Sequence, residues 1–252
     1  GRADDMLVIR GVNVFPTQIE EVLLQIPEIG PHYEILVERK NRLDVMTITV
    51  ELVDEVAGLA AKQGCDAVIS VGGGSNIDVG KAVAALLTNG GSALDYLEVV
   101  GKGKKVEKDP VPFIAVPTTA GTAAEVTINY VITDVERKRK FVCVDPHDMP
   151  VVAVVDPDMM ATMPVGLTAA TGMDALTHAI EGYTTKAAWA MTDMFHLEAI
   201  RLIAQNLRDA VAEAKSGVPG SGREGMALAQ YIAGMGFSNV GLGIVHSMAH
   251  GL

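Results

Sequence analysis

Two pairs of metal-ligating side chains repeat the same four-residue spacing in the second half of the chain. Asp174 precedes His178 in GMDALTHAIEGY, and His246 precedes His250 in GIVHSMAHGL. On an α-helix, residues four apart project from one face, one turn from each other. Two such pairs on facing helices would bring nitrogen and oxygen donors to one point, as in the metal sites of helical bundles. The spacing predicts a metal site; the alternative gives each histidine an ordinary core or surface role.

A glycine-rich turn stands where a predicted strand meets a predicted helix. The apolar run 66–71, expected to be a strand covered on both sides, leads into GGGS at 72–75, and a helix is expected over 76–87. Glycines let the backbone approach a ligand, and the free amides at a helix start attract anions such as pyrophosphate. The motif departs from G-x-G-x-x-G, so an ordinary strand–helix turn stays an alternative to phosphate binding.

A second turn of the same kind follows the predicted strand 112–117. It has the sequence TTAGT at 118–122, and its hydroxyls and amides suit a ribose or a pyrophosphate. A hairpin over 129–144 and a strand over 151–156 come next. Strands that alternate with helices predict an open α/β sheet, whose ligand is expected at the carboxyl ends of the strands.

The elements that follow are predicted to be helical. The expected helices cover 172–183, 189–215 and 225–250. Asp193 and His196 lie three residues apart in an amphipathic stretch and are interpreted as surface residues. A helix is also expected at 53–63, with Val56, Leu59 and Ala60 on its apolar face and Gly64 as its cap.

The composition of the chain excludes some classes of binding partner and favours one cellular location. The net charge of −11 argues against nucleic acid and anionic membranes as partners. No apolar run approaches the roughly 20 residues that span a bilayer. Cys65 and Cys143 lie in apolar segments and are predicted to be buried free thiols, which favours the cytoplasm. Both ends of the chain are interpreted as cut, because it opens without methionine and stops in a helical run.

The first 52 residues predict a small module of their own. A strand at MLVIRG, a turn at 13–16, a helix that begins with the capping box Thr17 to Glu20, and two further strands give the order β-α-β-β. GRADDM and RGVNVFP resemble the C-terminal lid domain of phenylacetate–CoA ligases, an AMP-forming family. The catalytic lysine of that lid has no counterpart here, so we expect a structural remnant without ligase activity.

The complete expectation is an α/β fold in three parts. A β-α-β-β module over 1–52 precedes a partial Rossmann-like open sheet over 53–160, the expected dinucleotide-binding domain. An all-α helical domain over 161–252 would carry the metal.

Four long motifs resemble the iron-containing alcohol dehydrogenases over residues 53–252. They are VGGGSNIDVGKA, VPTTAGTAAEVTINYVITDVERKRKFVCVDPHDMP, ATGMDALTHAIEGY and MGFSNVGLGIVHSMAH. The resemblance implies metal ligation by Asp174, His178 and His246, and places His250 beside the nicotinamide as a proton relay. It implies that NAD is bound by Gly72, Gly73, Gly74, Ser75, Asp78, Thr118, Thr119, Thr122 and Lys140.

The same resemblance implies an oxidoreductase that transfers hydride between NAD(H) and small aldehydes or alcohols such as lactaldehyde and 1,2-propanediol. Iron(II) is the implied metal, although zinc suits the same ligands, and a homodimer is expected. The family's fourth ligand, a histidine further downstream, and its opening βα units have no counterpart here. The chain is therefore interpreted as a truncated chimera, and a non-catalytic fusion with residual cofactor or metal binding is the competing expectation.

Overall fold

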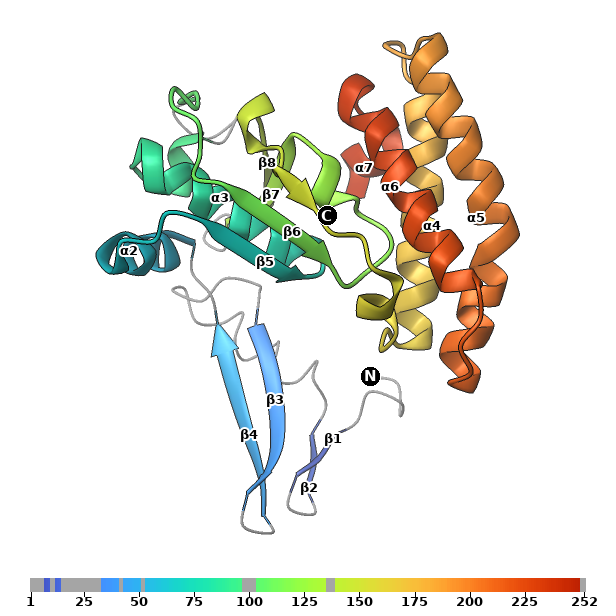
Figure 1. The fold of residues 1–252 in the computed structure, drawn as a ribbon, viewed down its shortest axis with the longest axis horizontal. Coiled ribbons are helices and arrows are strands. Elements are labelled where there is room, and N and C mark those ends of the chain that lie inside the picture. The colour runs from blue at the N-terminus through green and yellow to red at the C-terminus, as the bar shows by residue number, and fades with distance from the viewer. Residues whose placement is uncertain are drawn as a thin grey trace.

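A computed structural model describes residues 7–9, 12–14, 33–40, 43–50, 53–96, 103–134 and 139–249 of the chain (Figure 1). The predicted helix that begins at Thr17 lies outside these described residues, and so does His250.

Two antiparallel hairpins are described in the first 52 residues. Strand β1 (Leu7–Ile9) pairs with β2 (Val12–Val14), and β3 (Tyr33–Lys40) pairs with β4 (Leu43–Val50). The strands expected around β1, β3 and β4 are present. The turn expected at 13–16 is wrong for its first two residues, because Asn13 and Val14 belong to strand β2 and pair with β1.

Helix α2 (Val53–Gln63) has the predicted bounds and the predicted glycine stop. Gly64 adopts φ +69°, its amide donates to Ala61, and the Cys65 amide donates to Ala60, which is the Schellman pattern. Two expectations are wrong here. Leu59 is 60% exposed, because the buried face of the helix is centred on Ala57, and Cys65 is exposed because it lies beyond the cap.

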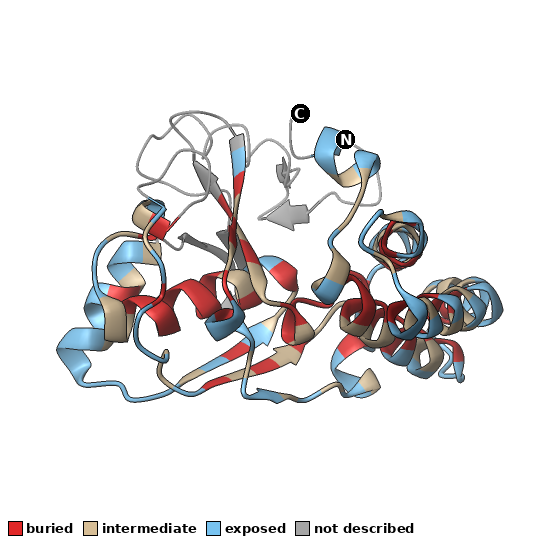
Figure 2. Ribbon diagram, turned by 90° about the horizontal axis from the view of Figure 1, so that it is seen from above, coloured by how far each residue is buried: buried red, intermediate tan, exposed pale blue. Residues whose placement is uncertain are grey.

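The central sheet is parallel, with the strand order β5-β6-β9. Its strands are β5 (Val68–Gly72), β6 (Phe113–Pro117) and β9 (Val152–Ala153). Helix α3 (Gly74–Asn89) packs on one face of this sheet (Figure 2). Ile77 and Ala84 of the helix share a core there with Phe113 and Ala115 of β6. The opposite face is open: Ile69 of β5 is 66% exposed. The expectation of a strand covered on both sides is therefore wrong for the described part of the chain.

A second layer of packing lies against the other side of α3. The predicted hairpin is formed by β7 (Asn129–Asp134) and β8 (Arg139–Val144), and Tyr130 and Phe141 share a core with α3. Short 3-10 turns connect the strands at Ala93–Tyr96 (η2), Ala124–Val126 (η3), Pro146–Asp148 (η4) and Pro157–Met160 (η5).

Long helices stand beside the sheet and pack on one another (Figure 1). They are α4 (Val165–Thr184), α5 (Ala190–Ser216) and α6 (Gly222–Val240), followed by the short α7 (Ile244–Ala249). The expected helix 225–250 is divided, because Gly241 adopts φ +75° and ends α6. Among the described residues, no helix has both the length and the apolar character required to cross a bilayer.

The surface assignment of His196 is wrong. Its side chain is fully buried in α5, between Gly182 of α4 and Gly236 of α6. A Cβ atom on either glycine would lie within 2.4 Å of the imidazole Nε2, so the two glycines make the space for the ring. Asp193, three residues earlier, is half-buried.

Candidate functional site

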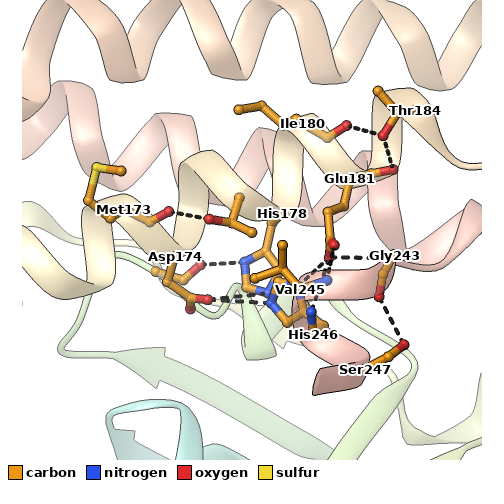
Figure 3. Close-up of polar contacts among 12 residues, drawn as sticks. Met173, Asp174, His178, Ile180, Glu181, Thr184, Gly243, Val245, His246 and Ser247 are labelled. Atoms are coloured by element: carbon orange, nitrogen blue, oxygen red, sulfur yellow. Dashed lines mark hydrogen bonds and ion pairs between the residues drawn. The ribbon is translucent and has the colours of Figure 1, made fainter. Parts of the chain in front are cut away.

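Asp174, His178 and His246 converge on one point (Figure 3). Their ligand atoms all lie within 4.8 Å of one another. Asp174 and His178 project from one face of α4, as their spacing predicts, and His246 comes from α7. The Asp174 Oδ1 atom lies 3.8 Å from Nε2 of His178 and 3.4 Å from Nε2 of His246. The three predicted metal ligands therefore form one cluster.

The His178 ring is held on both faces and at one edge. It stacks on Phe237 at a centroid distance of 4.5 Å and on His246 at 4.3 Å. Its Nδ1 atom lies 3.2 Å from the carbonyl oxygen of Gly121, which only accepts, so Nδ1 carries the proton. Burial lowers the pKa of His178 to about 4, which keeps the imidazole neutral and leaves Nε2 as a lone-pair donor.

His246 is held by a carboxylate that the sequence reasoning missed. Its Nδ1 atom lies 2.6 Å from Oε2 of Glu181, a buried residue of α4. The pKa of His246 is raised, mainly by hydrogen bonding to Asp174 and also by the hydrogen bond to Glu181. Burial of the ring acts in the opposite direction but is outweighed. Burial works against ionisation of Glu181, but hydrogen bonds from His246 and from the Val245 and Gly243 amides hold its pKa below the usual range.

This donor set fits a divalent metal. His178 directs Nδ1 at the Gly121 carbonyl and His246 directs Nδ1 at Glu181, so both rings turn Nε2 towards the Asp174 carboxylate. Such an approach is unfavourable unless a proton or a cation lies between the groups. Metal bonds of about 2.0–2.2 Å would hold their ligand atoms roughly 3–4 Å apart, close to the separations here. One carboxylate with two imidazoles suits iron or zinc.

The cluster opens into a cavity of about 360 Å³ that reaches the glycine-rich turn. From the sheet side it is lined by predicted cofactor residues, and from the helical side by the three metal ligands. Phe237, Leu242 and Val245 add an apolar wall. The predicted site residues along this cavity are Gly74, Ser75, Asp78, Thr122, Lys140, Asp174, His178 and His246.

The two turns predicted to bind the cofactor, GGGS at 72–75 and TTAGT at 118–122, lie next to each other at the carboxyl ends of β5 and β6. Gly72 pairs with Pro117, and the Thr118 amide donates to the Gly72 carbonyl at 2.9 Å. A Cβ atom on Gly74 would lie 2.5 Å from Oγ1 of Thr122, so the close approach of the two turns requires glycine at this position. The Thr119 side chain lies beside Gly73. Four of the predicted cofactor residues do not line the cavity: Gly72, Gly73, Thr118 and Thr119.

Two charged side chains of α3, Asp78 and Lys81, support the wall of the cavity. Asp78 accepts a hydrogen bond from the Val131 amide at 3.0 Å. Lys81, one turn later on α3, donates to the Thr127 and Asn129 carbonyls at 2.7 and 2.8 Å. Burial raises the pKa of Asp78 to about 7 and lowers that of Lys81 to about 8, and each charge opposes the shift of the other. Sequence reasoning had no signal for this role of Lys81.

Two further residues were missed by the sequence reasoning. Glu181 falls seven residues after Asp174, which places it on the same helix stripe, so the helical period could have indicated it. Phe237 stacks on His178 from α6, and nothing local in the sequence indicates that contact.

Comparisons with known proteins agree with this geometry. The family description "Iron-containing alcohol dehydrogenase" matches residues 8–157, and "Fe-containing alcohol dehydrogenase family, C-terminal" matches residues 168–252. The first match begins within the segment that resembles a ligase lid. Together the two matches include every residue of the metal cluster and of the glycine-rich turn.

Relatives and solved structures extend the comparison. Lactaldehyde reductase of Escherichia coli K12 is 56% identical over 204 residues, which are 81% of this chain and 52% of that protein. A crystal structure of 1,3-propanediol oxidoreductase superposes with a TM-score of 0.72 at 44% identity, covering 79% of this chain and 50% of that one. Sulfoacetaldehyde reductase from Bifidobacterium kashiwanohense, in complex with NAD+, has a TM-score of 0.70 at 37% identity and covers 75% and 49%. The chain spans about half the length of the curated relatives it matches.

Proposed function

Because the chain belongs to the iron-containing alcohol dehydrogenase family, we propose that it takes part in hydride transfer between NAD(H) and small aldehydes or alcohols. One observation carries the proposal: a single cavity is lined both by Gly74 and Ser75 of the glycine-rich turn and by Asp174, His178 and His246. A dinucleotide bound across the turn would thus place its reactive end towards the metal ligands. Lactaldehyde and 1,2-propanediol are the proposed substrates, supported by the name of the relative that is 56% identical.

Each proposed role follows from the position of the residue. Asp174, His178 and His246 would bind the metal, iron(II) or zinc, through the carboxylate and the two Nε2 atoms. The amides at the start of α3, beside Gly74 and Ser75, lack helical partners and suit the cofactor's pyrophosphate. When bound, the metal supplies a Lewis acid that polarises a carbonyl oxygen, and NADH supplies the hydride.

Residues around the cavity have proposed roles towards protons and towards the substrate. His178 remains neutral because it is buried, so it serves as a ligand and not as a proton donor. Phe237, Leu242 and Val245 form an apolar wall against which the apolar part of a small substrate would lie. Four residues after His246 in the sequence, His250 is proposed to pass the proton to the product oxygen.

The remaining parts of the proposal concern location and assembly. Cys143 is a buried free thiol, which supports the cytoplasm as the proposed location. A homodimer is proposed because α5 carries exposed apolar side chains, Met191, Met194 and Leu197, in one stretch.

Metal binding and turnover should be measured on the same protein. We expect the purified chain to bind Zn²⁺ and Fe²⁺, and Asp174→Ala to lose most of that affinity, because one of the three clustered ligands is removed. Asp209→Ala is the matched control, since Asp209 is an exposed aspartate in the interior of α5. Oxidation of NADH with lactaldehyde tests the reaction. Equal metal content in Asp174→Ala and the parent chain would contradict the metal site. Binding of metal and NADH without turnover would favour a non-catalytic chain that keeps only cofactor and metal binding.

A further inference from the structure

Helix α7, which carries His246, has little apolar packing to hold it. None of its six residues is buried, and its side chains Ile244 and Met248 are largely exposed. Burial of apolar surface, the usual source of helix stability in proteins, therefore contributes little to its position. A ligand histidine must nevertheless be held within a fraction of an ångström of its productive geometry.

Glu181 supplies the anchor that packing does not. Its carboxylate accepts from the Gly243 amide at 3.0 Å, the Val245 amide at 2.6 Å and, more weakly, the His246 amide at 3.5 Å. These are amides at the start of α7, which have no partners within the helix. A Cβ atom on Gly243 would lie 2.9 Å from Oε1, so glycine permits this close approach. One buried carboxylate thus caps the helix and holds the His246 ring.

The contact with Nδ1 also selects the tautomer. A neutral imidazole has a single proton, and the two carboxylates compete for it: Glu181 at 2.6 Å from Nδ1 and Asp174 at 3.4 Å from Nε2. The shorter hydrogen bond is the stronger, so the proton resides on Nδ1. The Nε2 atom then keeps its lone pair and faces the metal position between Asp174 and His178.

We propose that Glu181 is the positioning residue of the metal site: it caps α7 and holds His246 in the tautomer and orientation that present Nε2 to the metal. This inference rests on the proposed metal site. A carboxylate behind a ligand histidine fixes the ring and raises its basicity, and loss of such a partner typically costs about 10- to 100-fold in metal affinity.

The tautomer can be read directly from the unaltered chain. We would label the histidines with ¹⁵N, assign His246 by comparison with His246→Gln, and record the ring-nitrogen shifts of the metal-free protein at a pH where the imidazoles are neutral. We expect a protonated Nδ1 and an unprotonated Nε2. A proton on Nε2 would overturn the proposal, whatever the metal affinity.

Measurement of Zn²⁺ affinity then distinguishes the positioning of His246 by Glu181 from a general effect of Glu181 on the stability of the fold. Glu181→Gln should lower the affinity by about 10- to 100-fold, because the amide nitrogen donates to Nδ1 and moves the ring proton to Nε2. Glu213→Gln is the matched control: Glu213 is also buried and caps a helix, accepting from the Gly222 amide at 2.7 Å and the Arg223 amide at 3.2 Å, without a histidine.

The outcomes of the two measurements are distinct. An unchanged affinity in Glu181→Gln, or an equal fall in both variants, would overturn the proposal. If Glu181→Gln does not fold, the tautomer of the unaltered chain decides. A parent chain that binds no Zn²⁺ would contradict the proposed metal site itself, while the tautomer would still report whether Glu181 positions His246.

Discussion

Replacement of Lys81 by methionine should destabilise the chain, and more strongly at pH 8 than at pH 6. The Lys81 ammonium is 1% exposed and donates to the Thr127 carbonyl, the Thr127 hydroxyl and the Asn129 carbonyl. Methionine keeps the length of the side chain and removes every donor. At pH 6, where Asp78 is largely protonated, the cost is that of unsatisfied buried acceptors, about 1–3 kcal/mol.

The dependence on pH comes from Asp78. Its folded-state pKa, about 7, is raised above the value of 3.8 for the free side chain, so its contribution to stability is present at acidic pH and declines as the pH rises through 7. Lys81 opposes that rise, so its removal raises the pKa of Asp78 further. Between pH 7 and pH 8 the parent loses little further stability through Asp78, whereas the variant loses up to about 1.4 kcal/mol per pH unit. The unsatisfied acceptors and this loss together give a total of about 2–4 kcal/mol at pH 8.

Urea unfolding followed by circular dichroism at pH 6 and pH 8 measures both quantities. Lys62→Met is the control, because Lys62 is exposed at the end of α2 and should change stability little at either pH. A loss below about 1 kcal/mol at pH 8 would refute the reasoning about the Lys81 hydrogen bonds, and the same loss at both pH values would refute the coupling of Lys81 to Asp78.

Glycine contacts supply two further predictions. Gly74→Ala places a Cβ atom 2.5 Å from Oγ1 of Thr122, so we expect the two turns to separate and NADH affinity, measured by fluorescence titration, to fall by about tenfold or more. Gly236→Ala places a Cβ atom 2.4 Å from the His196 ring and should lower the free energy of unfolding by about 1–3 kcal/mol. Gly166→Ala, with open space around it in α4, should instead be neutral or stabilising in the same assay.

The sequence was sufficient to predict those structural features that depend on a few neighbouring residues. The bounds of α2 and its stop at Gly64 follow from helical period and from the positive φ that glycine tolerates. The helix-face pairing of Asp174 with His178 follows from the same period. The position at strand ends of the two turns predicted to bind the cofactor follows from the alternation of strands and helices.

The burial of individual side chains could not be derived in the same way, because it depends on which helices and strands pack against one another in the fold. The polarity pattern of α5 is amphipathic, yet His196 is fully buried, since Gly182 and Gly236 come from two other helices to make room for its ring. Likewise, apolar Ile69 is exposed although its strand has the composition of a covered one, because α3 packs on a single face of the sheet.

The metal cluster combines both kinds of information. The sequence by itself determined the ligand types and the pairing of Asp174 with His178, since one turn of helix encodes that geometry. The family resemblance implied that His246 joins them, but only the tertiary structure shows which contacts bring it there. The chain ends α6 at Gly241, turns back, and is held through α7 by the Glu181 carboxylate, so the third ligand arrives by a contact between residues 65 apart in the sequence. Such a contact depends on packing and long-range hydrogen bonds, which no local period specifies.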